Sequence, residues 1–275
     1  MTHTNGLPLA RVHQAKAPTT LSGRLVATTL ITSALNANTR TEAFNLFAST
    51  YDGAERDRFE RDLAEKQLVI LLRDRATQQL KGFSTILIRD VVSNGSPATV
   101  IFSGDTVIDR RYWGQKVLQR EFVRILTRHK LRSPAQPLYW FLISKGYRTY
   151  LLMANAFPRA IPRVDQPDIP ELRVLLNSLA CDRFGAQYDV SSGVVRYADA
   201  HERVRAELAP VDDTALGNRH VAFFVQCNPD HAAGDELACI AEVRLVDLVR
   251  VVSRIARVQL RNGTRTWVHH GRSQP

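Results

Sequence analysis

A turn with several basic residues lies within the stretch IDRRYWGQKVLQREFVRILTRHK, which runs from Ile108 to Lys130. An apolar run ends there, a glycine follows at Gly114, and apolar residues then recur at helical spacing. Unpaired backbone N–H groups at the start of a helix, together with the positive end of the helix dipole, attract anions. Arg110, Arg111 and Lys116 place basic side chains in the same turn. The residue types and their spacing therefore predict a strand-to-helix turn that binds an anion such as phosphate.

Basic residues also recur along the helix that this turn begins. Lys116, Arg120, Arg124 and Arg128 are spaced four residues apart, so they drift by about 40° per step on a helix of 3.6 residues per turn and share one broad face. One interpretation is a docking surface for an acidic partner. The other is a solvated face opposite the apolar stripe that begins at Leu118. The sequence leaves both interpretations open.

The elements that must position this turn can be inferred from the hydrophobic periods around it. In chain order we expect helices at 39–53 and 54–66, a β-hairpin of 68–72 and 83–88, a strand at about 98–108, a helix with its apolar stripe at 118–126, a strand at 136–143 and a helix at 144–157. Thr41 is the expected cap of the first helix. Gly104, inside the third strand, indicates a bulge or a close backbone approach.

The pattern loosens after residue 157. Four prolines within 158–170 predict a linker or a rigid loop, because proline is excluded from helix interiors and central strands. A helix at 171–185, two strands at 220–226 and 237–243, and a closing helix at 243–260 are expected to follow. The predicted organisation is a flexible arm at 1–22, a core at 23–157 and a C-terminal extension at 158–275.

The order of elements around DRRYWGQKVL, over roughly 39–157, resembles the GNAT superfamily of N-acyltransferases. The resemblance implies an α/β fold with a mixed central sheet flanked by helices, here with an inserted or extended C-terminal part. In that family a turn of the kind Q/R-x-x-G-x-G/A binds the pyrophosphate of coenzyme A through successive backbone N–H groups. The match is partial, since Arg111 and Gly114 fit the pattern in one register while Lys116 occupies its last small position.

The resemblance implies transfer of an acyl group from a thioester donor, acyl-coenzyme A or an acyl-phosphopantetheine, to an amine of a small molecule. The donor-binding residues that it implies are Val107, Ile108, Arg111, Gly114, Gln115, Lys116, Val117 and Leu118. Tyr147 and Tyr150 lie close to where the family often has a tyrosine that protonates the leaving thiolate. Asp105 would face the acyl group and could accept a proton from the amine. Packing in the core is the more common role for either tyrosine, and an aspartate beside a glycine is also common in turns.

Composition limits the remaining function classes. The 275 residues are 44% hydrophobic, which suffices for a full core, and the formal net charge of +10 favours an acidic partner or ligand. The chain lacks any apolar run long enough to span a membrane and any signal-peptide order, so we expect a cytoplasmic protein. Its three cysteines and eight histidines show no metal spacing, and phosphate-loop, dinucleotide and nucleophile-elbow motifs are missing.

Two alternatives to an enzyme stay open on these residues. A basic nucleic-acid-binding protein would need aromatic residues among the basic ones, and these are missing beyond the turn, so nucleic acid is an unfavoured partner. A non-catalytic GNAT-like protein that binds a ligand or a partner is the second alternative. If the chain is an enzyme, the basic helix favours an acyl carrier protein as donor, because that partner is acidic and needs less of the turn. Arg120, Arg124 and Arg128 would dock it.

Overall fold

The computed structural model describes residues 23–197, 203–204 and 211–270. The arm expected at 1–22 lies outside the described residues. Within them, one nine-stranded sheet forms the centre of the molecule, and β7 (Ala160–Ile161) joins it beside β11. The other strands, in their order across the sheet, are β1 (Leu25–Ile31), β3 (Leu68–Asp74), β4 (Leu80–Ser93), β5 (Ser96–Ile108), β6 (Leu138–Ser144), β11 (Glu236–Glu242), β9 (Val194–Val195) and β8 (Tyr188–Asp189).

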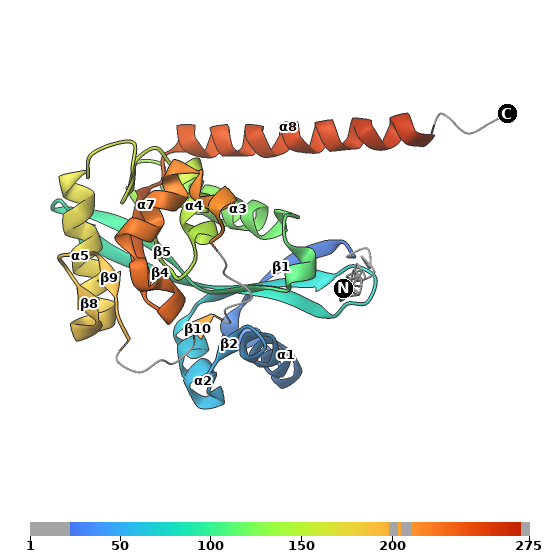
Figure 1. Ribbon diagram of the computed structural model, residues 1–275, viewed down its shortest axis with the longest axis horizontal. Helices are drawn as coiled ribbons and strands as arrows, with labels where there is room; N and C mark the ends of the chain where they lie inside the picture. The colour runs from blue at the N-terminus through green and yellow to red at the C-terminus, as the bar shows by residue number, and fades with distance from the viewer. Residues whose placement is uncertain (1–22, 198–202, 205–210, 271–275) are drawn as a thin grey trace, which may run out of the picture.

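Helices cover both faces of this sheet, as Figure 1 shows. One face carries α3 (Val117–Arg132), α4 (Tyr147–Ala156), α7 (Arg219–Cys227) and α8 (Leu245–His270). The other carries α1 (Ala37–Ala48), α2 (Arg56–Glu65) and α5 (Pro170–Phe184). Side chains alternate between the two faces along β3, which explains the two helical layers. Ile70 and Leu72 pack on the face covered by α3 and α4, and Val69 and Leu71 pack on the face covered by α1 and α2. The mixed sheet between two helical layers confirms the expected fold class.

The C-terminal part contributes to the same sheet. β11 pairs antiparallel with β6, and β8, β9 and β7 extend the sheet from there. α8 returns along α3, and its far end projects beyond the body of the protein in Figure 1. β2 (Tyr51–Asp52) and β10 (Arg203–Val204) form a separate two-stranded sheet, and α6 (Asp213–Leu216) is a single turn before α7. Residues far apart in sequence therefore meet at the centre of the sheet.

β5 and β6 are the parallel pair of the described sheet, and they stay paired over a short distance only. The ladder joins Thr99 to Leu138 and ends where Ser103 meets Leu142. β5 nevertheless continues to Ile108. Its pairing with β4 shifts register at this point, because two residues of β5, Gly104 and Asp105, lie opposite a single residue of β4. The bulge predicted at Gly104 is confirmed.

Several expectations about local structure need correction. Residues 220–226 were expected to form a strand and instead lie in α7, whose cap Asn218 accepts a hydrogen bond from the His220 N–H. A short apolar run fits either period, and burial of Val221 and Phe224, three residues apart, decides for a helix. The cap of α1 is Asn36 rather than Thr41. β1, an edge strand rich in β-branched residues, was not predicted from the sequence.

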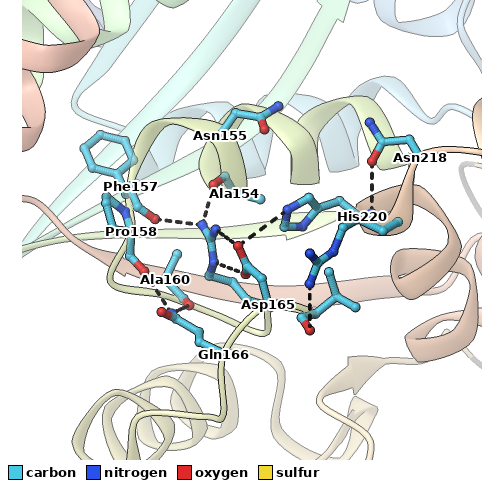
Figure 2. Close-up of polar contacts among 12 residues, drawn as sticks. Ala154, Asn155, Phe157, Pro158, Ala160, Asp165, Gln166, Asn218 and His220 are labelled. Atoms are coloured by element: carbon cyan, nitrogen blue, oxygen red, sulfur yellow. Dashed lines mark hydrogen bonds and ion pairs between the residues drawn. The ribbon is translucent and has the colours of Figure 1, made fainter.

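An arginine joins α4 to the segments that follow it (Figure 2). The Arg163 guanidinium donates to the carbonyls of Ala154 and Phe157 at the end of α4, and it binds Asp165 through Nε and Nη2 at 2.7 and 2.6 Å. His220 of α7 places Nε2 3.8 Å from the same carboxylate. A cation at a helix C-terminus is stabilised by the helix dipole. The cluster therefore holds α4 against the loop after β7 and against α7.

Replacing this carboxylate should cost stability in a pH-dependent way. Hydrogen bonds from Arg163 lower the pKa of Asp165 from 3.8 to about 2. A lowered folded-state pKa stabilises the fold above the unfolded-state value and loses that effect as the pH falls through the folded value. We expect Asp165→Asn to lower the free energy of unfolding by about 1.5 kcal/mol at pH 6. Urea unfolding of both proteins between pH 6 and pH 2.5 should show this difference shrinking; a constant difference would contradict the assignment.

Candidate active site

A cavity of about 560 Å³ opens where β5 and β6 separate. Asp105 and Thr106 line it from the bulged end of β5, and Ile143 and Lys145 line it from the end of β6. Gly104 is needed at this bend, because an added Cβ would lie 2.5 Å from Thr85 Oγ1 and 2.9 Å from a carbon of the Lys66 side chain. The bulge thus lies where the ladder between β5 and β6 ends, and the separation of these two strands gives the cavity its width.

The cavity reaches both faces of the sheet. Leu118 and Tyr147 line it on the face covered by α3 and α4. Phe59, Phe102 and Phe184 line it on the face covered by α2 and α5. A molecule bound in the gap between the two strands would therefore have one end on each side of the sheet.

The strand-to-helix turn lies on the α3 side of this cavity. Gly114 has φ +87°, which favours glycine, and Lys116 has φ +55° immediately before the helix begins at Val117. Gly114 to Leu118 all line the cavity. In the described part of the chain no acceptor pairs with the N–H groups of Gly114, Gln115 or Lys116, and the first N–H groups of α3 lack intrahelical acceptors by helix geometry. Such a turn can bind an anion through its backbone.

Side chains as well as backbone groups hold the turn in place, and the side chains serve the part from Tyr112 to Gln115. Gln115 pairs with the start of β1, accepting from the Leu25 N–H at 2.9 Å and donating to the Gly23 carbonyl at 2.8 Å. Trp113 Nε1 donates to the Ile108 carbonyl, and the Tyr112 hydroxyl donates to Asp74. The Gln115 side chain is therefore occupied by β1, and this residue can contribute its backbone alone.

Arg111, a second residue expected to contact the donor, is engaged with an acid of the same turn. Its guanidinium binds Asp109 through Nε at 3.1 Å and through Nη2 at 2.6 Å. Hydrogen bonds from Arg111 lower the pKa of Asp109. Arg111 does not line the cavity, whereas Val107 and Ile108 do. The structure also brings in a basic residue that the sequence reading missed, Arg148, whose guanidinium lies 4.8 Å from the Trp113 ring at the cavity wall.

The two candidate tyrosines have different surroundings. Tyr147 begins α4 and lines the cavity. Tyr150 is 1% exposed, packs against Phe224 and His220, and is not a lining residue. Its hydroxyl has no hydrogen-bond partner among the described residues, and burial raises its pKa. Helical spacing therefore turns Tyr150 from the cavity into the core, against the expected placement near the reacting groups, while Tyr147 remains a candidate.

The basic stripe separates from the cavity after its first residue. Lys116 lines the cavity, whereas Arg120, Arg124 and Arg128 line an open groove between α3 and α8 together with the apolar Ile255. Arg124 also pairs with Glu121 at 2.6 Å. Arginine stems commonly cover apolar surface while their charges stay in water. The stripe is therefore in part a cover for the seam between two helices.

Charged and aromatic residues from distant segments meet on the α2 and α5 side of the cavity. Lys145 follows β6, Glu236 begins β11, and Tyr51 and Tyr197 lie beside them. The sequence reading missed this group, because strand pairing alone brings its members together. Asp62 of α2 binds a further lining residue, the buried Lys66, at 2.5 Å. Among the described residues no cluster of His, Cys, Asp or Glu could hold a metal, and no helix there could cross a membrane.

Comparison with known proteins found similarity in structure only. No protein-family model matches the chain, and no curated protein sequence matches it. A probable N-acyltransferase of Enterococcus faecalis is 16% identical and covers 46% of this chain and 31% of its own, with a TM-score of 0.35. A GNAT-family N-acetyltransferase of Escherichia coli, solved with CoA, is 13% identical over 48% of this chain and 73% of its own, with a TM-score of 0.34. An acetyltransferase of Trypanosoma brucei is 19% identical over 53% of this chain and 100% of its own, with a TM-score of 0.35.

These matches are likenesses of fold. The strand order, the bulged β5, the short parallel contact with β6 and the turn before α3 are features of this chain itself. Together they form an architecture that resembles the one expected from the GNAT superfamily.

Proposed function

We propose that the protein is an N-acyltransferase that moves an acyl group from a thioester to an amine of a small molecule. The observation that carries this proposal is the cavity through the sheet, which joins the unpaired N–H groups of the α3 turn to a group of charged and aromatic residues on the other face. An anionic donor and an amine acceptor can meet there from opposite sides.

The donor would bind on the α3 side. Phosphate oxygens accept from the N–H groups of Gly114 to Leu118, and Lys116 adds a positive charge at the helix start. Beyond Ser103 the edge of β5 has left its ladder with β6. Its backbone groups near Val107 and Ile108 suit the amides of a phosphopantetheine arm, which coenzyme A and acyl carrier proteins both have.

The chemistry would be direct attack of the amine on the thioester. The amine nitrogen bonds to the carbonyl carbon, the carbon–sulfur bond breaks, and an amide and a thiol result. Asp105 accepts a proton from the amine, and Tyr147 donates a proton to the departing thiolate. Holding both reactants within the gap between the strands would supply much of the rate.

Lys116 should contribute to donor binding through its charge. We expect Lys116→Glu to weaken coenzyme A binding by tenfold or more, about 1.4 kcal/mol, because the reversed charge faces the phosphates. Arg128→Glu, about 18 Å further along the helix, is the matched control and should change binding less than twofold. Lys116→Gly keeps a backbone suited to positive φ but removes the charge, so its affinity for coenzyme A should fall a few-fold. Isothermal titration calorimetry with coenzyme A measures all three. A Lys116→Gly variant that binds more tightly than wild type would instead mean that the lysine obstructs the turn.

Tyr147 and Tyr150 form a matched pair of variants. We expect Tyr147→Phe to lower kcat by about 100-fold, the usual loss when a general acid is removed. Tyr150→Phe should leave kcat within twofold, because it removes a buried hydroxyl that has no hydrogen-bond partner among the described residues. Steady-state acyl transfer to an amine, with thiol release as the readout, compares them. Equal effects of the two substitutions would remove Tyr147 from the mechanism.

The donor class can be tested through the arginines of α3. If an acyl carrier protein delivers the thioester, Arg120→Glu combined with Arg124→Glu should slow transfer from the carrier by tenfold or more at low salt and leave transfer from the same acyl-coenzyme A unchanged, because rim charges mainly steer association. The coenzyme A reaction is the internal control in each preparation. Faster transfer from coenzyme A at every salt concentration, with both donors slowed alike by the variant, would assign the reaction to coenzyme A.

A further inference from the structure

An acid and a base of opposite charge face one another on the α2 and α5 side of the cavity. Glu236 is the first residue of β11 and Lys145 follows the last residue of β6, next to the register pair Leu237 and Ser144. Glu236 is a buried residue, 7% exposed, and its carboxylate Oε1 lies 3.6 Å from Lys145 Nζ. A direct charge-assisted hydrogen bond would measure about 2.7–2.9 Å. The pair is thus close but not in tight contact.

Two tyrosines complete the surroundings of this pair. The Tyr197 hydroxyl donates to Glu236 Oε2 at 2.6 Å, which fixes the carboxylate. Lys145 Nζ lies 4.9 Å from the centre of the Tyr51 ring and 5.7 Å from that of Tyr197. Aromatic faces at such distances attract cations. An ammonium group is therefore already recognised at this place in the cavity, by a carboxylate and two rings.

We propose that this group binds an α-amino acid as the acyl acceptor, with Glu236 taking its ammonium and Lys145 taking its carboxylate. The inference rests on the proposed acyltransfer and names the acceptor class. A zwitterion that enters between Glu236 and Lys145 gives each a new partner of opposite charge, and the net charge of the site does not change. A simple amine would instead bring a second cation beside Lys145, where like charges repel.

Two other cations that line this end of the cavity, Lys66 and Arg183, lie closer to their acids. Asp62 binds Lys66 at 2.5 Å and Arg183 at 3.2 Å, and Glu65 lies 3.3 Å from the same arginine. Breaking the first contact would leave the buried Lys66 ammonium without its acid, which is costly. The Lys145 ammonium lies at a longer distance from its acid and at the end of a flexible four-carbon stem. Of Lys66, Arg183 and Lys145, Lys145 lies farthest from its acid, and we assign it to the substrate carboxylate.

Binding of matched ligands tests this inference without any donor present. Glycine, leucine, phenylalanine and serine would each be titrated by calorimetry beside their methyl esters and the corresponding decarboxylated amines. We expect the wild-type protein to bind at least one amino acid tenfold or more tightly than its ester and its amine. Lys145→Met should weaken binding of the amino acid by tenfold and leave binding of the ester unchanged or tighter. Glu236→Gln should weaken binding of all three kinds of ligand, because each of them carries an ammonium group.

Lys130→Met and Glu242→Gln are the controls, since both residues lie outside the cavity and bind Gln136 and Arg159 instead. Circular dichroism would check that each variant is folded; should Glu236→Gln unfold, the wild-type and Lys145→Met comparison decides by itself. Esters or amines that bind wild type as tightly as amino acids, an unchanged preference in Lys145→Met, or no binding of any amino acid would each overturn the inference.

Acyl transfer with the same ligands separates this inference from the function on which it rests. Amino acids that bind in a Lys145-dependent manner but receive no acyl group from coenzyme A or carrier thioesters would refute the proposed acyltransfer and retain the binding site. Transfer to simple amines at rates equal to those for amino acids would retain the acyltransfer and refute the acceptor class. Preferential transfer to amino acids that Lys145→Met abolishes supports both.

Discussion

A bulge in β5 is the constraint on which the rest of the site depends. Parallel strands normally continue as a ladder, because each buried backbone group needs a partner. Gly104 and Asp105 take up two positions opposite one residue of β4, and the ladder with β6 ends just before them. The backbone edge beyond the bulge faces a cavity instead of a strand. Without this break the sheet would be closed, and neither face would communicate with the other.

The turn before α3 makes use of the same opening. It begins where β5 ends, and side chains anchor it: Gln115 to β1, Tyr112 to Asp74 and Trp113 to Ile108. Because these contacts use side chains, the backbone N–H groups of Gly114, Gln115 and Lys116 stay without an acceptor among the described residues. Lys116 adopts the left-handed conformation that a glycine would favour. The chain therefore keeps the backbone shape of a glycine-containing turn and adds a charge, at the cost of some local strain.

Much of this arrangement could be predicted from sequence, and the limits have physical reasons. The apolar stripe of α3, the first β-hairpin and the bulge at Gly104 depend on local periods and on one residue type, so they could be read directly. The helix at residues 220–226 could not be predicted, because a short apolar run fits both the helical and the strand period, and only the burial of its side chains distinguishes them. Lys145 and Glu236 also lacked any local signal, since the pairing of β6 with β11 creates their contact.

The distribution of charge around the cavity differs between the two faces of the sheet. On the α3 side, Lys116 and Arg148 line the cavity, and among the described residues neither forms an ion pair with an acid. On the opposite side, Asp62 and Glu236 balance the lysines nearest to them. The proposed anionic donor is therefore assigned to the first side, where unpaired positive charge and helix N–H groups coincide. On the second side Lys145 and Glu236 offer one charge of each sign within 3.6 Å, which is the basis of the proposed zwitterionic acceptor. In the proposed function, this difference in charge assigns the donor to the α3 side and the acceptor to the opposite side.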